Sequence, residues 1–74
     1  MKVSIIETRG IIWEGMAKRA ILPAKEGQIC VLDNHQPFLA RLKEGVVRLP
    51  EMETQIKEGI ALMNANELKV YVEF

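Results

Sequence analysis

Turn signals interrupt this sequence so often that only short secondary-structure elements fit between them. Gly-, Pro- and Asn-containing turns recur at intervals of roughly 5 to 14 residues, the length of a short strand with its turn. These signals are Arg9-Gly10, Glu14-Gly15, Pro23 to Gly27, Asp33 to Pro37, Glu44-Gly45, Pro50 and Asn64-Ala65-Asn66. The spacing is typical of β-sandwiches and barrels. We therefore predict an all-β fold, a small sandwich of two antiparallel sheets, in a single domain over residues 1–74.

The clearest strand lies at the end of the sequence, where apolar and polar residues alternate strictly. Successive side chains of a strand point to opposite faces, so every second residue shares one face. The apolar set is Leu68, Val70, Val72 and Phe74. Asn64-Ala65-Asn66 before it predicts a hairpin turn, because Asn tolerates the left-handed backbone that tight turns need. Shorter alternations predict strands around Val3 and Ile5 and around Val47 and Leu49.

The segment from Glu51 to Met63 fits two different structures. Four of its apolar residues recur at helical spacing: Met52, Ile56, Ile60 and Met63. Pro50 suits the first turn of such a helix, but Gly59 would cost it about 1 kcal/mol and suits a β-bulge instead. We favour a strand from Gln55 to Met63 and keep the helix as the alternative. The residues that share the buried face of this strand are Ile56, Ile60 and Leu62.

Charge and composition exclude several classes of protein. Ten basic and ten acidic residues give a formal net charge of zero, so nothing attracts a polyanion at long range. A nucleic-acid-binding barrel would need a basic groove with stacking aromatic residues, and the few aromatic residues here are scattered. We see no leader peptide and no apolar run of about 20 residues. We therefore predict a soluble or peripheral protein that binds no nucleic acid and does not insert into the membrane.

Catalytic and metal-binding residues are scarce. The chain has one histidine and one cysteine, whereas zinc sites use three or four such ligands. A nucleophile pair of Cys30 with His35 is conceivable, but Cys30 lies inside an apolar run, where we expect a buried and unreactive thiol. A single cysteine also excludes an internal disulfide and fits a reducing compartment. The sequence therefore predicts no catalytic residue, no metal site and no cofactor, and hence a protein that is not an enzyme.

His35 and Trp13 each allow a structural and a functional interpretation. A histidine in a turn between strands is most often a hydrogen-bonded structural residue, but it is also placed to touch a partner. A tryptophan beside Ile11 and Ile12 is most often part of the core, yet tryptophan is also enriched at interface anchors. Both interpretations stay open for each residue.

Two other functions fit a small β-rich chain. A lipoyl- or biotinyl-type carrier domain has this size, and Lys18 after Gly15-Met16-Ala17 loosely matches a modified lysine. Such a lysine needs an exposed hairpin tip, however, and Lys18 lies in a run that leads toward Ile21 and Leu22. A stand-alone protein-interaction adaptor is the other alternative.

The stretch from Leu22 to Leu39 carries a recognisable pattern. Two apolar runs, Ile29 to Leu32 and Phe38 to Leu42, flank the loop from Asp33 to Pro37, in the order L-P-x-x-x-G-x-x-x-V-L-x-x-H-x-P-x-L. A short run and then Gly45-Val46-Val47-Arg48-Leu49 follow it. This order resembles the N-terminal β-sandwich domain of the epsilon subunit of F-type ATP synthases.

The resemblance covers residues 3–74, and its specific part is residues 22–49. It implies a rotor subunit of the central stalk that couples the gamma shaft to the membrane ring of c subunits. The expected location is peripheral, on the cytoplasmic face of an energy-coupling membrane, with a bacterial cell membrane as the first expectation. The residues of two loops are expected to face the c-ring: Lys25, Glu26, Gly27, Gln28, Asn34, His35 and Gln36. The residues expected to define turns of the fold are Gly27, Pro37, Gly45 and Gly59.

The chain departs from the family pattern at several positions. Gln28 stands where the family's Glu-Gly-Glu loop has its second acid, which leaves Glu26 as the remaining acid. Asp33-Asn34 replaces the usual Pro-Gly before His35, and asparagine is the best non-glycine residue for a left-handed backbone. The sequence stops at Phe74 without the helical hairpin that inhibits ATP hydrolysis in the family. The resemblance therefore implies a subunit that supports coupling without this inhibition.

Overall fold

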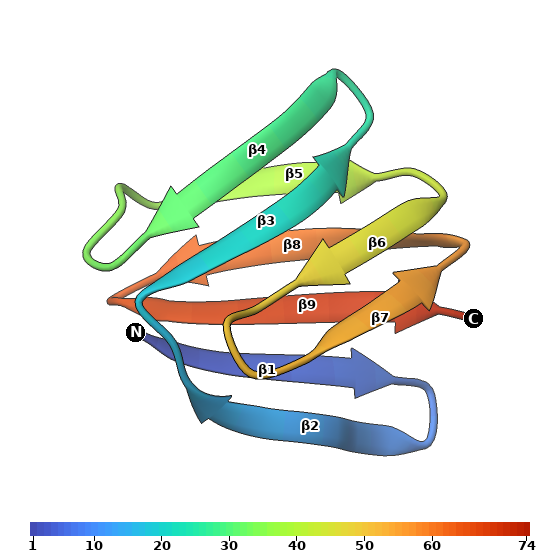
Figure 1. Cartoon of the computed structure of the whole chain (residues 1–74), viewed down its shortest axis with the longest axis horizontal. Coiled ribbons are helices and arrows are strands. Elements are labelled where there is room, and N and C mark those ends of the chain that lie inside the picture. The colour runs from blue at the N-terminus through green and yellow to red at the C-terminus, as the bar shows by residue number, and fades with distance from the viewer.

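The chain folds into nine β-strands and no helix in the computed structural model, which describes residues 1–74 (Figure 1). The strands are β1 (Lys2–Glu7), β2 (Gly10–Met16), β3 (Arg19–Ala24), β4 (Gly27–Leu32), β5 (Phe38–Leu42), β6 (Gly45–Arg48), β7 (Glu53–Ile56), β8 (Glu58–Asn64) and β9 (Glu67–Glu73). The all-β prediction is confirmed. The alternative helix at Glu51 to Met63 is wrong, because that segment forms β7 and most of β8.

The strands follow one hydrogen-bonded path, β2-β1-β9-β8-β5-β3-β6-β7, and β4 pairs with β3 beside this path. The path curls back on itself, so that β3, β4, β6 and β7 form a layer in front of β1, β8 and β9 (Figure 1). A single register pair, Ala24 with Leu42, joins β3 to β5 and so connects the layers. All pairs are antiparallel except β1 with β9, which run parallel. No short turn links these two strands, so no hairpin forces them to be antiparallel.

The turn before β4 is tighter than the sequence suggested. β3 and β4 stay paired to their ends, so Pro23 lies inside β3 and only Lys25 and Glu26 connect the two strands. Gly27, the first residue of β4, has a φ of 134°. Only glycine adopts this backbone conformation without strain, which explains why a glycine follows the turn.

β8 and β9 form the hairpin that the sequence predicted at residues 64–66. Ala65 and Asn66 have φ values of 51° and 56°. Positive φ at both central residues is the signature of a type I′ turn, whose twist matches that of the flanking strands. β8 itself begins at Glu58, three residues later than the predicted start at Gln55.

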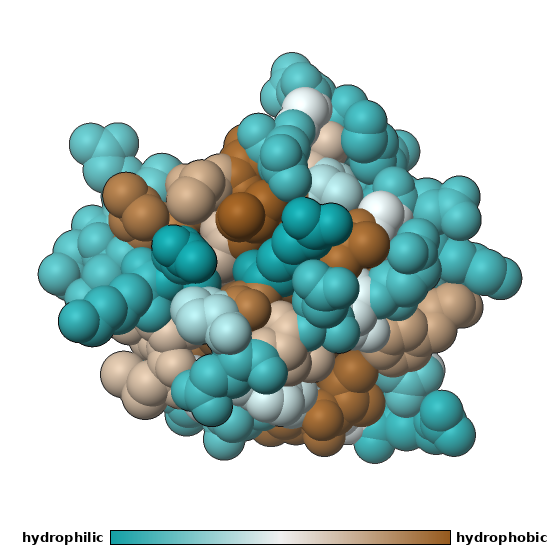
Figure 2. All heavy atoms as spheres, in the orientation of Figure 1, coloured by the Kyte–Doolittle hydropathy of each residue, from teal (hydrophilic) through white to brown (hydrophobic).

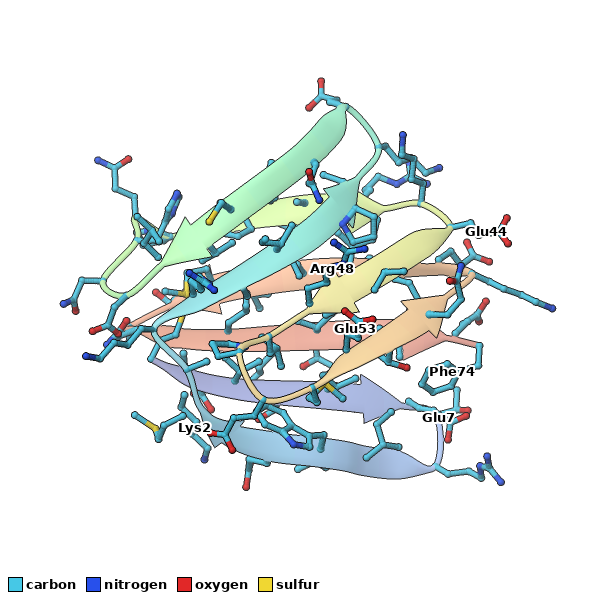
Figure 3. The ribbon with its side chains drawn as sticks, in the orientation of Figure 1. Lys2, Glu7, Glu44, Arg48, Glu53 and Phe74 are labelled. Carbon is cyan, nitrogen blue, oxygen red and sulfur yellow. The ribbon has the colours of Figure 1, made fainter.

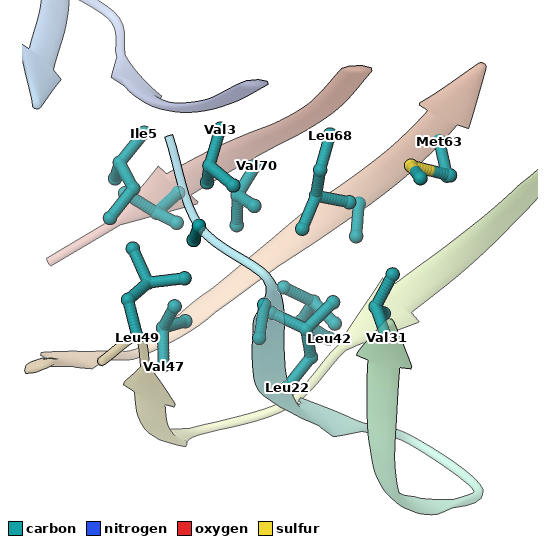
Figure 4. Packing of buried hydrophobic residues seen from close by; sticks show 14 of the residues in the cluster. Val3, Ile5, Leu22, Val31, Leu42, Val47, Leu49, Met63, Leu68 and Val70 are labelled. Atoms are coloured by element: carbon teal, nitrogen blue, oxygen red, sulfur yellow. The ribbon is translucent and has the colours of Figure 1, made fainter. Parts of the chain in front are cut away.

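A cluster of 17 buried apolar residues forms the core between the layers (Figure 4). In β9 the predicted alternation is confirmed, because Leu68 and Val70 are fully buried and Val72 is 4% exposed. Phe74 lies beyond the end of β9 and is 49% exposed, so its predicted inward position is wrong. Four more residues predicted to face inward are buried: Val3, Ile5, Val47 and Leu49.

The predicted buried face of the segment before β9 is wrong for two of its three residues. Ile60 and Leu62 point outward and are 44% and 38% exposed, whereas Ala61 between them is fully buried. A bend at Lys57 separates β7 from β8. The inward parity of Ile56 therefore does not continue into β8.

Gly59 lies inside β8, in regular register with β9, and not at a turn or a bulge. A Cβ at Gly59 would lie 2.3 Å from the carbonyl oxygen of Tyr71, so the two backbones approach too closely for any side chain. A register shift occurs instead between Ile5 and Ile6, where β1 meets β2.

Candidate functional site

The tip of the β3–β4 hairpin presents charged side chains to solvent. Lys25, Glu26 and Gln28 are exposed, and Gly27 between them is half-buried. The Lys25 N–H donates a hydrogen bond to the carbonyl oxygen of Arg41 on β5 at 2.9 Å. The tip therefore combines a fixed backbone with side chains that a partner can reach.

His35 lies in the exposed loop between β4 and β5, which ends at Pro37. Its Nδ1 is 2.8 Å from the carbonyl oxygen of Gln36, and a carbonyl can only accept, so Nδ1 is the donor. The ring meets Phe38 edge-on, with 5.2 Å between ring centroids and an interplanar angle of 79°. These contacts match the structural interpretation of His35, while its exposure keeps the ring accessible to a partner.

Asp33 and Asn66 tie this loop to two other segments. The Asp33 carboxylate accepts hydrogen bonds from the α-ammonium of Met1 and from Asn66 Nδ2, the latter at 3.2 Å. Asn66 Oδ1 accepts a hydrogen bond from the Asn34 N–H at 2.8 Å, and the α-ammonium also donates to the Ala17 carbonyl oxygen at 2.9 Å. We call these five residues the Asp33 end.

The hydrogen bonds at the Asp33 end change the acidity of its carboxylate. The bond from the α-ammonium of Met1 is the largest cause that lowers the pKa of Asp33, and the bond from Asn66 adds to it. Both donors favour the ionised form of the carboxylate. Asp33 is therefore held as a carboxylate by groups from other segments of the chain.

The structure does not bring the two predicted c-ring loops together. Lys25 to Gln28 lies at one end of β4 and Asn34 to Gln36 lies at the other (Figure 1). β4, along which the two loops are separated, has six residues, which corresponds to a length of about 20 Å at about 3.3 Å per residue. Both loops nevertheless flank the same unpaired edge, because β4 pairs only with β3.

The end of the sandwich opposite Asp33 holds charged residues that form no ion pair. Glu58 and Glu73 lie opposite each other on β8 and β9, while Arg41 on β5 and Lys25 line the same hollow. None of these four takes part in an ion pair within the chain. The hollow has a volume of about 390 Å³. We call these four residues the Glu58 end.

The two glutamates at this end disturb each other. A hydrogen bond with the Glu58 side chain and then the charge of Glu58 raise the pKa of Glu73. Like charges directly opposite each other on neighbouring strands are destabilising. The Glu58 end is therefore electrostatically strained in the isolated chain.

Sequence reasoning missed an apolar row on the outer face of the sheet. Pairing places Ile6 on β1 beside Tyr71 on β9, and Tyr71 beside Ile60 on β8. Ile6 is half-buried, whereas Tyr71 is 42% exposed and Ile60 is 44% exposed. We call these three residues the outer row. The run from Ile60 to Met63 could have revealed the outer row, because it is apolar on both faces of the strand. A strand with one face in water alternates between apolar and polar residues.

The opposite face of the molecule, formed by β3, β4, β6 and β7, carries both apolar and hydrophilic residues. Hydrophilic residues separate its apolar patches in Figure 2. Arg48 on β6 and Glu53 on β7 lie side by side on this face (Figure 3), with Nε and Oε2 3.6 Å apart. Some charges of this face are thus already paired within the chain.

Three other residues that the sequence singled out have clear positions. Cys30 is exposed on β4, so the expectation of a buried thiol is wrong; alternation turns Val31 to the core instead. Trp13 is half-buried and packs against the core, with part of its ring still accessible. Lys18 lies in the connection between β2 and β3, which do not pair, and not at the hairpin tip that a carrier domain needs.

The arrangement of polar residues gives no metal site. No group of three or more His, Cys, Asp and Glu side chains is positioned to hold a metal ion. The structure also contains no helix that is long and apolar enough to span a membrane. The surface instead carries two exposed loops at the ends of the β4 edge and the outer row.

Comparison with known sequences adds a family to this geometry. Residues 1–74 match the family model for "ATP synthase, Delta/Epsilon chain, beta-sandwich domain". The ATP synthase epsilon chain of Gloeothece citriformis is 37% identical over 76 residues, with 97% of this chain and 55% of that protein covered. The ATP synthase epsilon chain of Microcystis aeruginosa is 35% identical over 74 residues, with 95% of this chain and 54% of that protein covered. This chain thus spans about half the length of these curated relatives.

Solved structures share the fold. A chain of the Tetrahymena thermophila mitochondrial ATP synthase central stalk and c-ring superposes with a TM-score of 0.85, covering 100% of this chain and 63% of that chain, at 13% identity. A chain of the Euglena gracilis mitochondrial ATP synthase gives a TM-score of 0.81, covering 95% of this chain and 48% of that chain, at 17% identity. At such low identity the likeness shows the fold alone.

Proposed function

Because this chain belongs to the delta/epsilon family of ATP synthase β-sandwich domains, we propose that it works as an epsilon-type subunit of the central stalk. The observation that carries this proposal is the family match over the whole chain. In this role the sandwich binds the gamma shaft through one exposed face and contacts the ring of c subunits through another surface. It is a non-catalytic subunit, so contact surfaces do its work.

A subunit that transmits torque needs rigidity more than reactive groups. Of the 45 backbone hydrogen bonds, 37 lie within the strands, and the core cluster fills the space between the layers. A close-packed interior of this kind resists shear. The longest dimension of the molecule is 27 Å, which suits a small coupling element between a shaft and a ring.

We assign the ring contact to the edge of β4 together with its two flanking loops. An end-on position would bring either Lys25 to Gln28 or Asn34 to Gln36 to a flat ring, but not both, because about 20 Å separates them. Only the side of the molecule that carries the β4 edge presents both loops at once. Glu26 is the acid available for charge pairing there, since Gln28 replaces the second acid.

The location and regulation follow from the same role. We place the subunit on the periphery of the coupling membrane, and more specifically on the cytoplasmic face of a bacterial cell membrane. We also assign assembly and coupling, and not inhibition of ATP hydrolysis, to these 74 residues. A body with a longest dimension of 27 Å that sits on the ring has no extended element with which to reach distant catalytic sites.

Reconstitution tests this proposal. The chain should co-purify with its cognate gamma subunit as a stable complex. Added to an ATP synthase depleted of its epsilon subunit, it should restore coupled ion pumping without lowering the rate of ATP hydrolysis. Failure of the folded chain to bind gamma would remove the central-stalk assignment, and saturable inhibition of hydrolysis would move the inhibitory role to the sandwich.

Loop variants then test the ring contact separately. Glu26→Lys at the hairpin tip and His35→Ala in the β4–β5 loop should each lower the ratio of ion pumping to hydrolysis while the gamma complex stays intact. Glu51→Lys, an exposed glutamate in the turn between β6 and β7, is the matched control for added charge. An effect of only one of the two loop variants would favour an end-on contact over the β4 edge.

A further inference from the structure

The backbone nitrogen of Met1 is built into the fold. Met1 is 4% exposed, and its side chain belongs to the core cluster. Its α-ammonium donates a hydrogen bond to the carbonyl oxygen of Ala17, and its own carbonyl oxygen accepts one from the Ala17 N–H, both at 2.9 Å. Two residues that exchange both bonds form a regular antiparallel pair, so Met1 extends the pairing of β1 with β2 by one residue beyond Lys2. The α-ammonium is therefore a structural group.

A carboxylate from another part of the chain completes the surroundings of this nitrogen. Asp33, the only aspartate of the chain, accepts a hydrogen bond from the α-ammonium. Asn66 Nδ2 donates to the same carboxylate oxygen at 3.2 Å, and the Asp33 N–H donates to the carbonyl oxygen of Lys18 at 2.9 Å. These bonds hold the carboxylate in place. We call the Ala17 carbonyl and the Asp33 carboxylate together the α-amine site.

The loop after β4 does not need the Asp33 carboxylate for its own turn. The left-handed backbone lies at Asn34, which has a φ of 63°. The His35 N–H closes the turn on the Leu32 carbonyl oxygen at 3.0 Å. Neither feature uses the Asp33 side chain, whose hydrogen-bond partners come from two other segments of the chain. The α-ammonium therefore accounts for an acid at this position better than the turn does.

The chemistry of the α-amine site selects a free amine. An ammonium group has three N–H donors and a positive charge, and two of its donors meet two acceptors here, one of them anionic. An acylated nitrogen has one N–H and no charge, and its acyl group would compete with Asp33 for the space beside the nitrogen. The Asp33 side chain is 44% exposed, so water screens the ion pair and donor geometry carries part of the selectivity.

We propose that the α-amine site accepts only the free amine of Met1, and that hydrolysis of an N-terminal formyl amide is the reaction that must precede its formation. In this reaction water adds to the formyl carbon, the C–N bond breaks, formate leaves and the released amine takes up a proton. Once bound, the α-ammonium is shielded from acyl transfer. The site itself is independent of the proposed function, and only the choice of a formyl group rests on the bacterial location proposed above.

Chains made by chemical synthesis test the selectivity. Nα-formylation should lower the midpoint of thermal unfolding at pH 7 by at least about 5 °C. In an Asp33→Asn chain the same modification should cost less than half as much, because the charged acceptor is gone. Glu44→Gln is the control, since Glu44 is exposed and forms no ion pair, and formylation should cost as much there as in the unmodified chain. Equal shifts in the Asp33→Asn and Glu44→Gln chains, or no shift on formylation, would overturn the proposal.

The reactivity of the α-amine tests the same site without a formylated chain. Trace labelling with an amine-reactive acetyl ester, read by peptide mass spectrometry, should modify Met1 at least about tenfold more slowly in the folded chain than in the urea-unfolded chain. The exposed Lys43 is the internal control and should react at similar rates in both. Asp33→Asn should remove most of the protection of Met1. Equal rates for Met1 in the folded and unfolded chains, or protection unchanged by Asp33→Asn, would contradict the proposal. Neither measurement involves gamma, so its failure leaves the proposed function untouched.

Discussion

At the Asp33 end of the sandwich the polar groups bond to one another, whereas at the Glu58 end they face solvent and repel. Asp33 accepts hydrogen bonds from the α-ammonium of Met1 and from Asn66, which lower its pKa. Glu73 at the other end faces Glu58 and has a raised pKa. The carboxylate at the first end is surrounded by hydrogen-bond donors from other segments, whereas the two carboxylates at the second end lie next to each other.

The difference indicates which polar groups hold segments of the fold together and which charges stay unpaired within the chain. Four segments of the chain meet at the Asp33 end, so its hydrogen bonds fix the layers relative to each other. The unpaired charges at the Glu58 end form no ion pairs that would fix the layers. Oppositely charged groups of a binding partner would neutralise them. Residues arranged against the stability of the isolated chain are expected where a protein has a binding surface.

The largest expected effect is the difference in the free energy of unfolding between a substitution in the core and one in the outer row. Leu68 is fully buried directly after the Asn66 turn, so Leu68→Ala should lower the free energy of unfolding by about 2 to 5 kcal/mol. Ile60 at the Glu58 end is 44% exposed, and Ile60→Ala should cost less than about 1 kcal/mol. Urea unfolding of both variants measures this. Similar losses would mean that the outer row supports the fold and would break the comparison.

We expect a medium effect on stability when hydrogen bonds at the Asp33 end are removed. Asn66→Ala removes two hydrogen bonds and places alanine at a φ of 56°, so it should lower the free energy of unfolding by about 1 to 2 kcal/mol. Asn64→Ala is the matched control, because Asn64 is exposed in the same hairpin and its side chain forms no hydrogen bond. It should change stability by less than about 0.5 kcal/mol. A loss as large in the control would assign the effect to the hairpin in general.

The smallest effects concern pH, and the two ends should respond in opposite directions. The lowered pKa of Asp33 stabilises the fold above the ordinary pKa of an aspartate, and this contribution is lost as pH falls through the folded-state pKa. The raised pKa of Glu73 favours the fold when the group is protonated, and this contribution is lost as pH rises through the folded-state pKa.

Thermal unfolding from pH 3 to pH 7 measures both contributions. Asp33→Asn should remove part of the stability loss on acidification below about pH 4. Glu73→Gln should raise stability at pH 7 and leave it unchanged at low pH, where Glu73 is protonated. Coincident pH profiles for Glu73→Gln and the unmodified chain would show that the Glu58–Glu73 repulsion has no weight in the folded protein.

Much of the fold could be predicted from the sequence because its signals are local. The alternation of β9 and the hairpin at residues 64–66 depend on side-chain direction and turn chemistry over a few neighbouring residues. The two exposed loops were found because the pattern from Leu22 to Leu39 is specific to a family. The outer row was missed, since an apolar side chain in a strand is expected in the core unless its partners are known.

The sequence by itself determined that the chain forms short strands joined by tight turns, and which residues of β9 share a face. Only the tertiary structure decided which face became the inner one. In β8 both parities are apolar, and pairing with β5 and β9 turned Ala61 and Met63 inward and Ile60 outward. The same long-range pairing set β1 parallel to β9 and placed the two loops at opposite ends of β4. Strand period is a property of neighbours in the chain, whereas register and layering arise from contacts between residues far apart in it.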